Sequence, residues 1–119
     1  MLARAALRED WDAIHRLVGD RGSVRPDRDV FVVTGNPAES VLVWRPAAYV
    51  HELCCGDGPL RRLRADAMLN FAIAQAHARM WPIRDAEFVV LADNLRMLDY
   101  IRRLNATEED GGKLFSLDI

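Results

Sequence analysis

Residues 48–92 read AYVHELCCGDGPLRRLRADAMLNFAIAQAHARMWPIRDAEFVVLA. The first eight predict a strand over 48–55, and turn-forming residues follow at 56–59. A long helix is expected over 60–80, and a strand that is apolar on both faces over 86–92. A strand, a helix and a second strand in this order predict a parallel pair joined by a right-handed crossover.

The long helix is expected to bury one alanine-rich face against a sheet. Apolar residues recur along it at intervals of three and four residues: Leu63, Ala67, Phe71, Ala74 and Ala78. This spacing is typical of an amphipathic helix, and small side chains favour a close approach to the sheet.

The residues before this unit predict a helix and a hairpin. Over 8–18, the apolar residues recur with helical spacing and share one face: Trp11, Ile14, Leu17 and Val18. Two β-branched runs, 30–33 and 41–44, flank the turn residues 35–37 and predict two antiparallel strands.

The residues after it predict a helix and a last strand. Asp93 or Asn94 is a suitable N-cap for a helix that ends near Leu104. The run 114–117 predicts a strand antiparallel to its neighbour. The fold class is therefore α/β, with a mixed, mostly antiparallel twisted sheet and helices on both faces.

Length and composition limit the classes of function. The chain has 119 residues, so one domain over 1–119 is expected. A net charge of −2 argues against a nucleic-acid partner. No apolar run approaches the roughly 20 residues that cross a membrane, and the N-terminus lacks the apolar region of a signal peptide. These features predict a cytoplasmic protein without a membrane partner.

The cysteine and histidine residues do not form a metal-binding motif. Cys54 and Cys55 are adjacent, whereas His15, His51 and His77 lie far apart in the sequence. Structural zinc sites need paired ligands at short, characteristic spacings. No metal is expected, and the two thiols are interpreted as buried strand residues of a reducing compartment.

Two terminal segments carry a family resemblance. Residues 2–5, followed by the acidic and apolar run 9–14, resemble the first strand and first helix of the GCN5-related N-acetyltransferase (GNAT) superfamily. Asn94, Met97 and the triplet 104–106 are similar in spacing to a strand-end asparagine and the helix that follows it in that family. Residues 50–52, leading into a turn and the long helix, resemble the small members found in bacteriophage genomes.

The resemblance implies the acyl-CoA N-acyltransferase fold and acetyl-CoA as cosubstrate. In this family acetyl-CoA lies in a cleft where two parallel strands splay apart, and backbone N–H groups at the start of the long helix hold its diphosphate. The matching loop here contains Arg62, Arg64, Ala65, Asp66 and Ala67, with Asn94 at the end of the next strand. A second register, ending at Ala65, is also open.

The loop departs from the family pattern in two ways. Ala65 stands where glycine is expected, and its methyl group narrows the approach of a phosphate. Asp66 adds a negative charge, although three arginines at positions 61, 62 and 64 offset it.

The resemblance also implies catalytic residues on the strand 48–55. Glu52 or His51 is expected to act as the general base, and strict alternation allows only one of them to face the cleft. Backbone N–H groups near Leu53 and Cys54 would polarise the thioester carbonyl. The family's thiolate-protonating tyrosine falls at Ile101, one residue after Tyr100. Cys54 or Cys55 as an acetyl-accepting nucleophile is a minor alternative.

Three functions follow as hypotheses. The first is acetyl transfer from acetyl-CoA to a small-molecule or protein amine. The shortened segment between the first helix and the first long strand predicts an acceptor site that is open or completed in a homodimer. The second is a catalytically degenerate GNAT fold that serves as a protein-interaction or CoA-binding module. The third is an α/β domain unrelated to acyltransferases.

Overall fold

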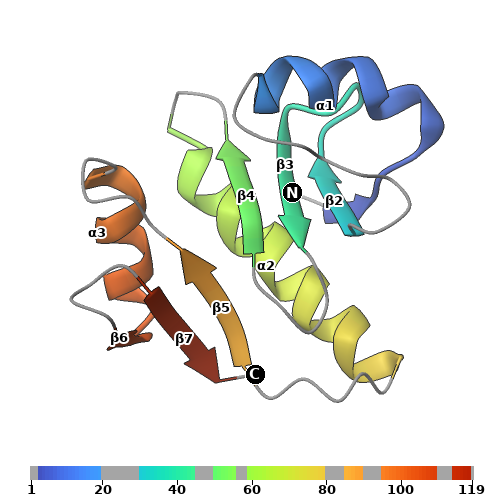
Figure 1. Cartoon of the computed structure of the whole chain (residues 1–119). Helices are drawn as coiled ribbons and strands as arrows, with labels where there is room; N and C mark the ends of the chain where they lie inside the picture. The colour runs from blue at the N-terminus through green and yellow to red at the C-terminus, as the bar shows by residue number, and fades with distance from the viewer. Residues whose placement is uncertain are drawn as a thin grey trace.

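The strands in the described part of the chain form one seven-stranded mixed sheet (Figure 1). The computed structural model describes residues 3–19, 30–44, 50–55, 59–79, 85–89, 95–109 and 114–118. The elements are, in chain order, β1 (Ala3–Ala5), a 3-10 turn η1 (Arg8–Asp10), α1 (Trp11–Val18), β2 (Val30–Thr34), β3 (Ser40–Trp44), β4 (Val50–Cys55), α2 (Arg61–Ala78), β5 (Asp85–Val89), α3 (Leu95–Arg103), β6 (Thr107–Glu109) and β7 (Leu114–Asp118). The α/β class expected from the sequence is confirmed.

The strand order is β1-β2-β3-β4-β5-β7-β6, and β4 with β5 is its parallel pair. The other neighbouring strands run antiparallel, including the expected β2–β3 hairpin and the β5–β7 pair. The helix α2 connects the two parallel strands, as a crossover requires. The sheet therefore changes from antiparallel to parallel at one place, between β4 and β5.

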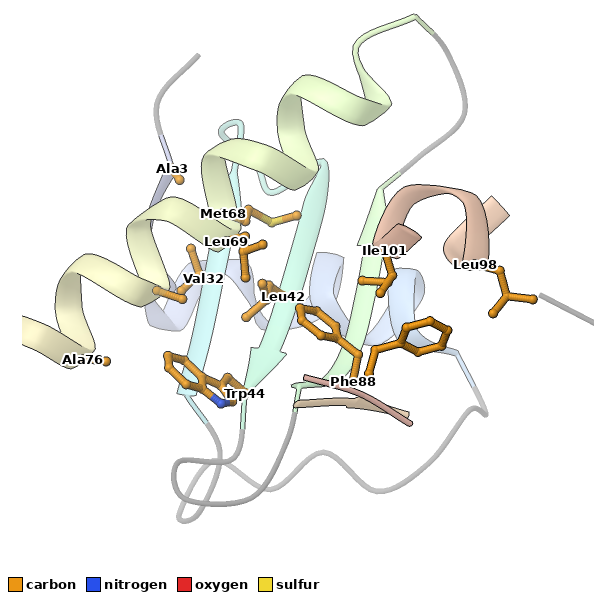
Figure 2. Packing of buried hydrophobic residues seen from close by; sticks show 12 residues of the cluster. Ala3, Val32, Leu42, Trp44, Met68, Leu69, Ala76, Phe88, Leu98 and Ile101 are labelled. Carbon is orange, nitrogen blue, oxygen red and sulfur yellow. The ribbon is translucent and has the colours of Figure 1, made fainter. Parts of the chain in front are cut away.

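Each face of the sheet has its own apolar core, because strand residues alternate between the faces. On one face α1 contributes Ala13, Ile14 and Val18, which pack with Phe31, Val33, Ala38, Val41 and Val43. On the other face α2 and α3 pack with Val32, Leu42, Trp44, Phe88 and Phe115. Figure 2 shows Met68 and Leu69 of α2 pointing toward Val32 and Leu42. Helices thus cover both faces, with α1 opposite α2 and α3.

The buried face of α2 differs from the one expected. Ala65, Met68, Leu69, Ala72 and Ala76 are buried. Of the residues expected inside, Leu63, Ala74 and Ala78 are exposed, and Ala67 and Phe71 are half-buried against the core. The helix is apolar on several sides, so its sequence periodicity does not fix which side meets the sheet.

The expected face of α1 is confirmed. Ile14 and Val18 are buried, and Trp11 and Leu17 are half-buried on the same core. Trp11 also makes an edge-to-face contact with Phe31, with ring centroids 4.8 Å apart. Polar residues occupy the opposite side of this helix, so its periodicity is unambiguous.

A partly buried ion pair, in which only Asp10 is fully covered, fixes the start of the chain to the β2–β3 turn. Arg4 donates from Nη1 and Nη2 to the Asp10 carboxylate at 2.7 and 2.9 Å, and its Nη2 also donates to the Gly35 carbonyl at 2.8 Å. The Leu7 backbone N–H donates to Asp10 Oδ2 at 2.8 Å. Hydrogen bonds from Arg4 and from the backbone hold the pKa of Asp10 below its usual value, although burial opposes this shift.

Some limits of the predicted elements are corrected. Strand β5 begins at Asp85 rather than residue 86, and residues 90–92 of the expected strand lie outside the described residues. The strand β6, a three-residue edge strand of polar residues paired with β7, was not expected from the sequence. Within the described ranges, no helix is both long and apolar enough to cross a membrane.

Candidate functional site

Among the described residues, a single residue pair joins the parallel strands β4 and β5. Val50 pairs with Phe88, whereas five residue pairs join β5 to β7 on its other side. Val50 is the first residue of β4 and Phe88 is the last but one of β5, so β4 continues beyond the described end of its neighbour (Figure 1). We call this place the β4–β5 seam.

A register shift in β4 lies beside the seam. Trp44 of β3 pairs with Val50, but the preceding Val43 pairs with Glu52, so His51 is the extra residue of a bulge. A bulge bends its strand and increases the local twist, so β4 changes direction beside its one described pair with β5. Side chains do not alternate strictly between the two faces of the sheet across a bulge. The expected alternation therefore does not decide which of His51 and Glu52 faces the cleft. The other two expected β4 residues, Leu53 and Cys54, pair in regular register with Leu42 and Val41.

The amino end of α2 carries cations and no acid in its first turn. The first turn begins at Arg61-Arg62, after Leu60, whose side chain does not cap the helix. Arg64 donates its backbone N–H to the Leu60 carbonyl at 2.9 Å. The backbone N–H groups of the residues that precede the first intrahelical hydrogen bond have no acceptor inside the helix. The helix dipole is also positive at this end. Arginine side chains here do not stabilise the helix, whereas an anion would.

The arginines differ in their surroundings. Arg64 reaches back to the β2–β3 turn, where its Nη2 donates to Glu39 Oε2 at 2.5 Å. The Arg64 side chain is 15% exposed, and that of Glu39 is 57% exposed. Arg62 is exposed, and no other described residue forms a hydrogen bond or ion pair with its guanidinium. Arg62 is therefore placed to meet an anion from solvent, whereas Arg64 is held by Glu39.

Asp66 faces the second helix of the same layer. The hydroxyl of Tyr100, on α3, donates to Asp66 Oδ1 at 2.8 Å. Ala65, at the position where the family has glycine, is buried, and Ala67 is half-buried against the main core. Ile101, the residue at the family's tyrosine position, is fully buried in that core. The tyrosine that reaches α2 from α3 is therefore Tyr100, and the family's tyrosine position is occupied by the buried Ile101.

The structure brings together part of the expected site. Arg62, Arg64, Ala65, Asp66 and Ala67 occupy the first two turns of α2, which follows β4 in the chain. Asn94 lies outside the described residues. No sequence pattern pointed to Glu39, the partner of Arg64, or to a bond between Tyr100 and Asp66. Both contacts join residues that are 25 and 34 positions apart in the chain.

Among the described residues, no group of three or more histidine, cysteine, aspartate or glutamate side chains is arranged to hold a metal ion. No profile of a known protein family matches the sequence, and neither the characterised proteins nor the solved structures include a significant match.

Proposed function

We propose that this chain has the acyl-CoA N-acyltransferase fold of the GNAT superfamily and transfers an acetyl group from acetyl-CoA to an amine. The observation that carries the proposal is the seam, where the described residues of two parallel strands share one pair beside a bulge. A strand that leaves its neighbour exposes backbone N–H and C=O groups that an amide-bearing ligand can pair with. The chain that leaves β4 here enters α2.

The charge at the start of α2 supports a diphosphate ligand. A helix amino terminus favours anions, and guanidinium groups bind phosphate through several N–H donors. Exposed Arg62 would meet the diphosphate first, and Arg64 would contribute once it leaves Glu39. His51 or Glu52 would accept the proton of the amine, and the N–H groups near Leu53 and Cys54 would stabilise the oxyanion.

Binding is tested by thermal denaturation with acetyl-CoA and with CoA. At 100 times its dissociation constant, a ligand stabilises the native state by about 2.7 kcal/mol, which is a clear shift for a domain of this size. Arg62→Ala should weaken binding, whereas Arg16→Ala, an exposed arginine on the opposite face, should not. Stabilisation that is equal in both variants, or no stabilisation at millimolar acetyl-CoA, would exclude a cofactor site at α2.

Catalysis is tested by the release of CoA in the presence of small amines and of a lysine-containing peptide. Removal of a general base lowers the rate by about 10²–10⁴-fold. Glu52→Gln and His51→Gln therefore distinguish the two candidate bases, provided that both variants still bind acetyl-CoA. Normal turnover in both variants would show that neither His51 nor Glu52 acts as the general base.

A second function, a CoA-binding or protein-interaction module without turnover, is favoured by a different observation. Arg64 and Asp66, both expected at the diphosphate, have partners within the protein in Glu39 and Tyr100. Acetyl-CoA binding without CoA release for any amine would support this function over the transferase. A homodimer measured by sedimentation would provide the partner that such a module requires.

A further inference from the structure

The two helices on one face of the sheet cover different sides of the seam. Helix α2 packs on the strands β1 to β4, and its Met68, Leu69 and Ala72 join Val32 and Leu42 in the core. Helix α3 follows β5, and its Leu98 and Ile101 share the core with Phe88 and Phe115. Figure 1 shows the same division, with α2 behind β4 and α3 beside β5 and β7.

Tyr100 and Asp66 connect these two sides directly. The bond from Tyr100 Oη to Asp66 Oδ1 is 2.8 Å long and partly buried, and it runs from α3 to α2. Both residues are half-buried, and the Tyr100 ring packs against the main core. A hydrogen bond to a charged carboxylate is stronger than one between neutral groups. Between the strands that these two helices cover, the described residues of β4 and β5 share one pair.

We propose that the Tyr100–Asp66 hydrogen bond is a clasp that closes the helix layer over the seam and must open before an acyl-CoA can enter. The proposal rests on the proposed function, because it assigns the ligand to the same seam. Asp66 thereby opposes the ligand in two ways: it holds Tyr100 across the entry, and it places a negative charge on the helix that would bind the diphosphate. The free protein is the closed form.

Three variants separate the bond from the charge. Tyr100→Phe removes the donor and leaves every charge in place. Asp66→Asn retains an acceptor for the phenol and removes the charge. Asp99→Asn, an exposed carboxylate on α3 beside Tyr100, is the matched control because its partner is Arg103 on the same helix.

The first measurement is amide hydrogen exchange of the free protein, which needs no ligand. In Tyr100→Phe, the amides of α3 and of the first two turns of α2 should exchange about tenfold faster than in the wild type. Asp66→Asn, which retains a weaker neutral bond, should give a smaller increase, and Asp99→Asn should leave these rates near the wild-type values. Unchanged exchange in Tyr100→Phe would overturn the clasp.

The second measurement is acetyl-CoA affinity by calorimetry. Tyr100→Phe should bind about tenfold more tightly than the wild type, because the ligand no longer has to break the bond. An equal or weaker affinity in this variant, with binding intact in the wild type, would also overturn the clasp. If no variant binds acetyl-CoA, the proposed function fails, and the exchange rates alone decide whether the two helices are clasped.

Discussion

At the scale of single residues, Asp10 has the best-defined electrostatic role. It is 2% exposed and accepts hydrogen bonds from Arg4 and from the Leu7 backbone. Its folded-state pKa is lowered, first by the Arg4 hydrogen bond. A carboxyl group with a lowered pKa stabilises the fold above its unfolded pKa of about 3.9, and this contribution is lost as the pH falls through the folded value.

Asp10→Asn should therefore lower the free energy of unfolding by about 2–3 kcal/mol at pH 7. The loss has two sources, the missing ionic bonds and the uncompensated guanidinium of Arg4. Urea denaturation at a series of pH values checks this, and the difference from the wild type should shrink below about pH 4. Asp12→Asn, at an exposed position on α1, should have no comparable effect. A constant difference between pH 7 and pH 3 would contradict the electrostatic explanation.

Glu39 controls Arg64 in the same local way. Its carboxylate binds the guanidinium at 2.5 Å, close to the end of α2 that would hold a diphosphate. Glu39→Gln should release Arg64 and remove a negative charge, so acetyl-CoA should bind up to about fivefold more tightly. Calorimetry measures the change, and Glu9→Gln, another exposed carboxylate, is the control. Weaker binding in Glu39→Gln would mean that Glu39 orients Arg64 for the ligand.

At the scale of elements, the orientation of α2 is open to a paired test. Ala72 is 2% exposed and lies in the main core, whereas Ala74 is exposed. Ala72→Leu should lower the free energy of unfolding by about 1–3 kcal/mol, because the added atoms have no room in a packed core. Ala74→Leu should change it by less than about 0.5 kcal/mol. Chemical denaturation of the two variants compares the faces, and the reverse order would restore the face expected from the sequence.

The contrast between α1 and α2 explains what the sequence could predict of the elements. In α1, Asp12, His15 and Arg16 separate the apolar residues, so one face is clearly apolar. In α2, alanines and larger apolar residues occur on several sides, and the contacts with the sheet decide which are buried. The edge strand β6 was missed because Thr107, Glu108 and Glu109 have no β-strand pattern of their own and depend on pairing with β7.

The candidate site was predictable to the extent that it depends on local sequence. Its expected position at the arginine-rich start of α2 came from the family resemblance, which was matched to the local sequence after β4. The bulge at His51 and the partners of Arg64 and Asp66 could not be predicted from the sequence. A bulge depends on the pairing of two strands, and both partners are distant in the chain. Long-range pairing is the step that periodicity cannot supply.

At the scale of the whole molecule, the two sides of the seam are joined mainly by the shared core. Val32 and Leu42 lie on one side, and Ile101 and Phe115 on the other, and all four belong to one cluster. Because the described residues of β4 and β5 share only one pair, this core is expected to make the sheet a single cooperative unit. A residue on one side should therefore control the stability of the other.

Phe115→Ala tests this expectation. Phe115 is fully buried, and truncation of a core phenylalanine costs about 3–5 kcal/mol. In native-state hydrogen exchange, the most protected amides of β2 and β3 should exchange faster by about 10²- to 4 × 10³-fold, the same factor as those of β7. Leu7→Ala, at an exposed apolar position, should alter neither group. If β2 and β3 retained wild-type protection while β7 lost it, the two sides of the seam would unfold independently, and the chain would comprise two units rather than one domain.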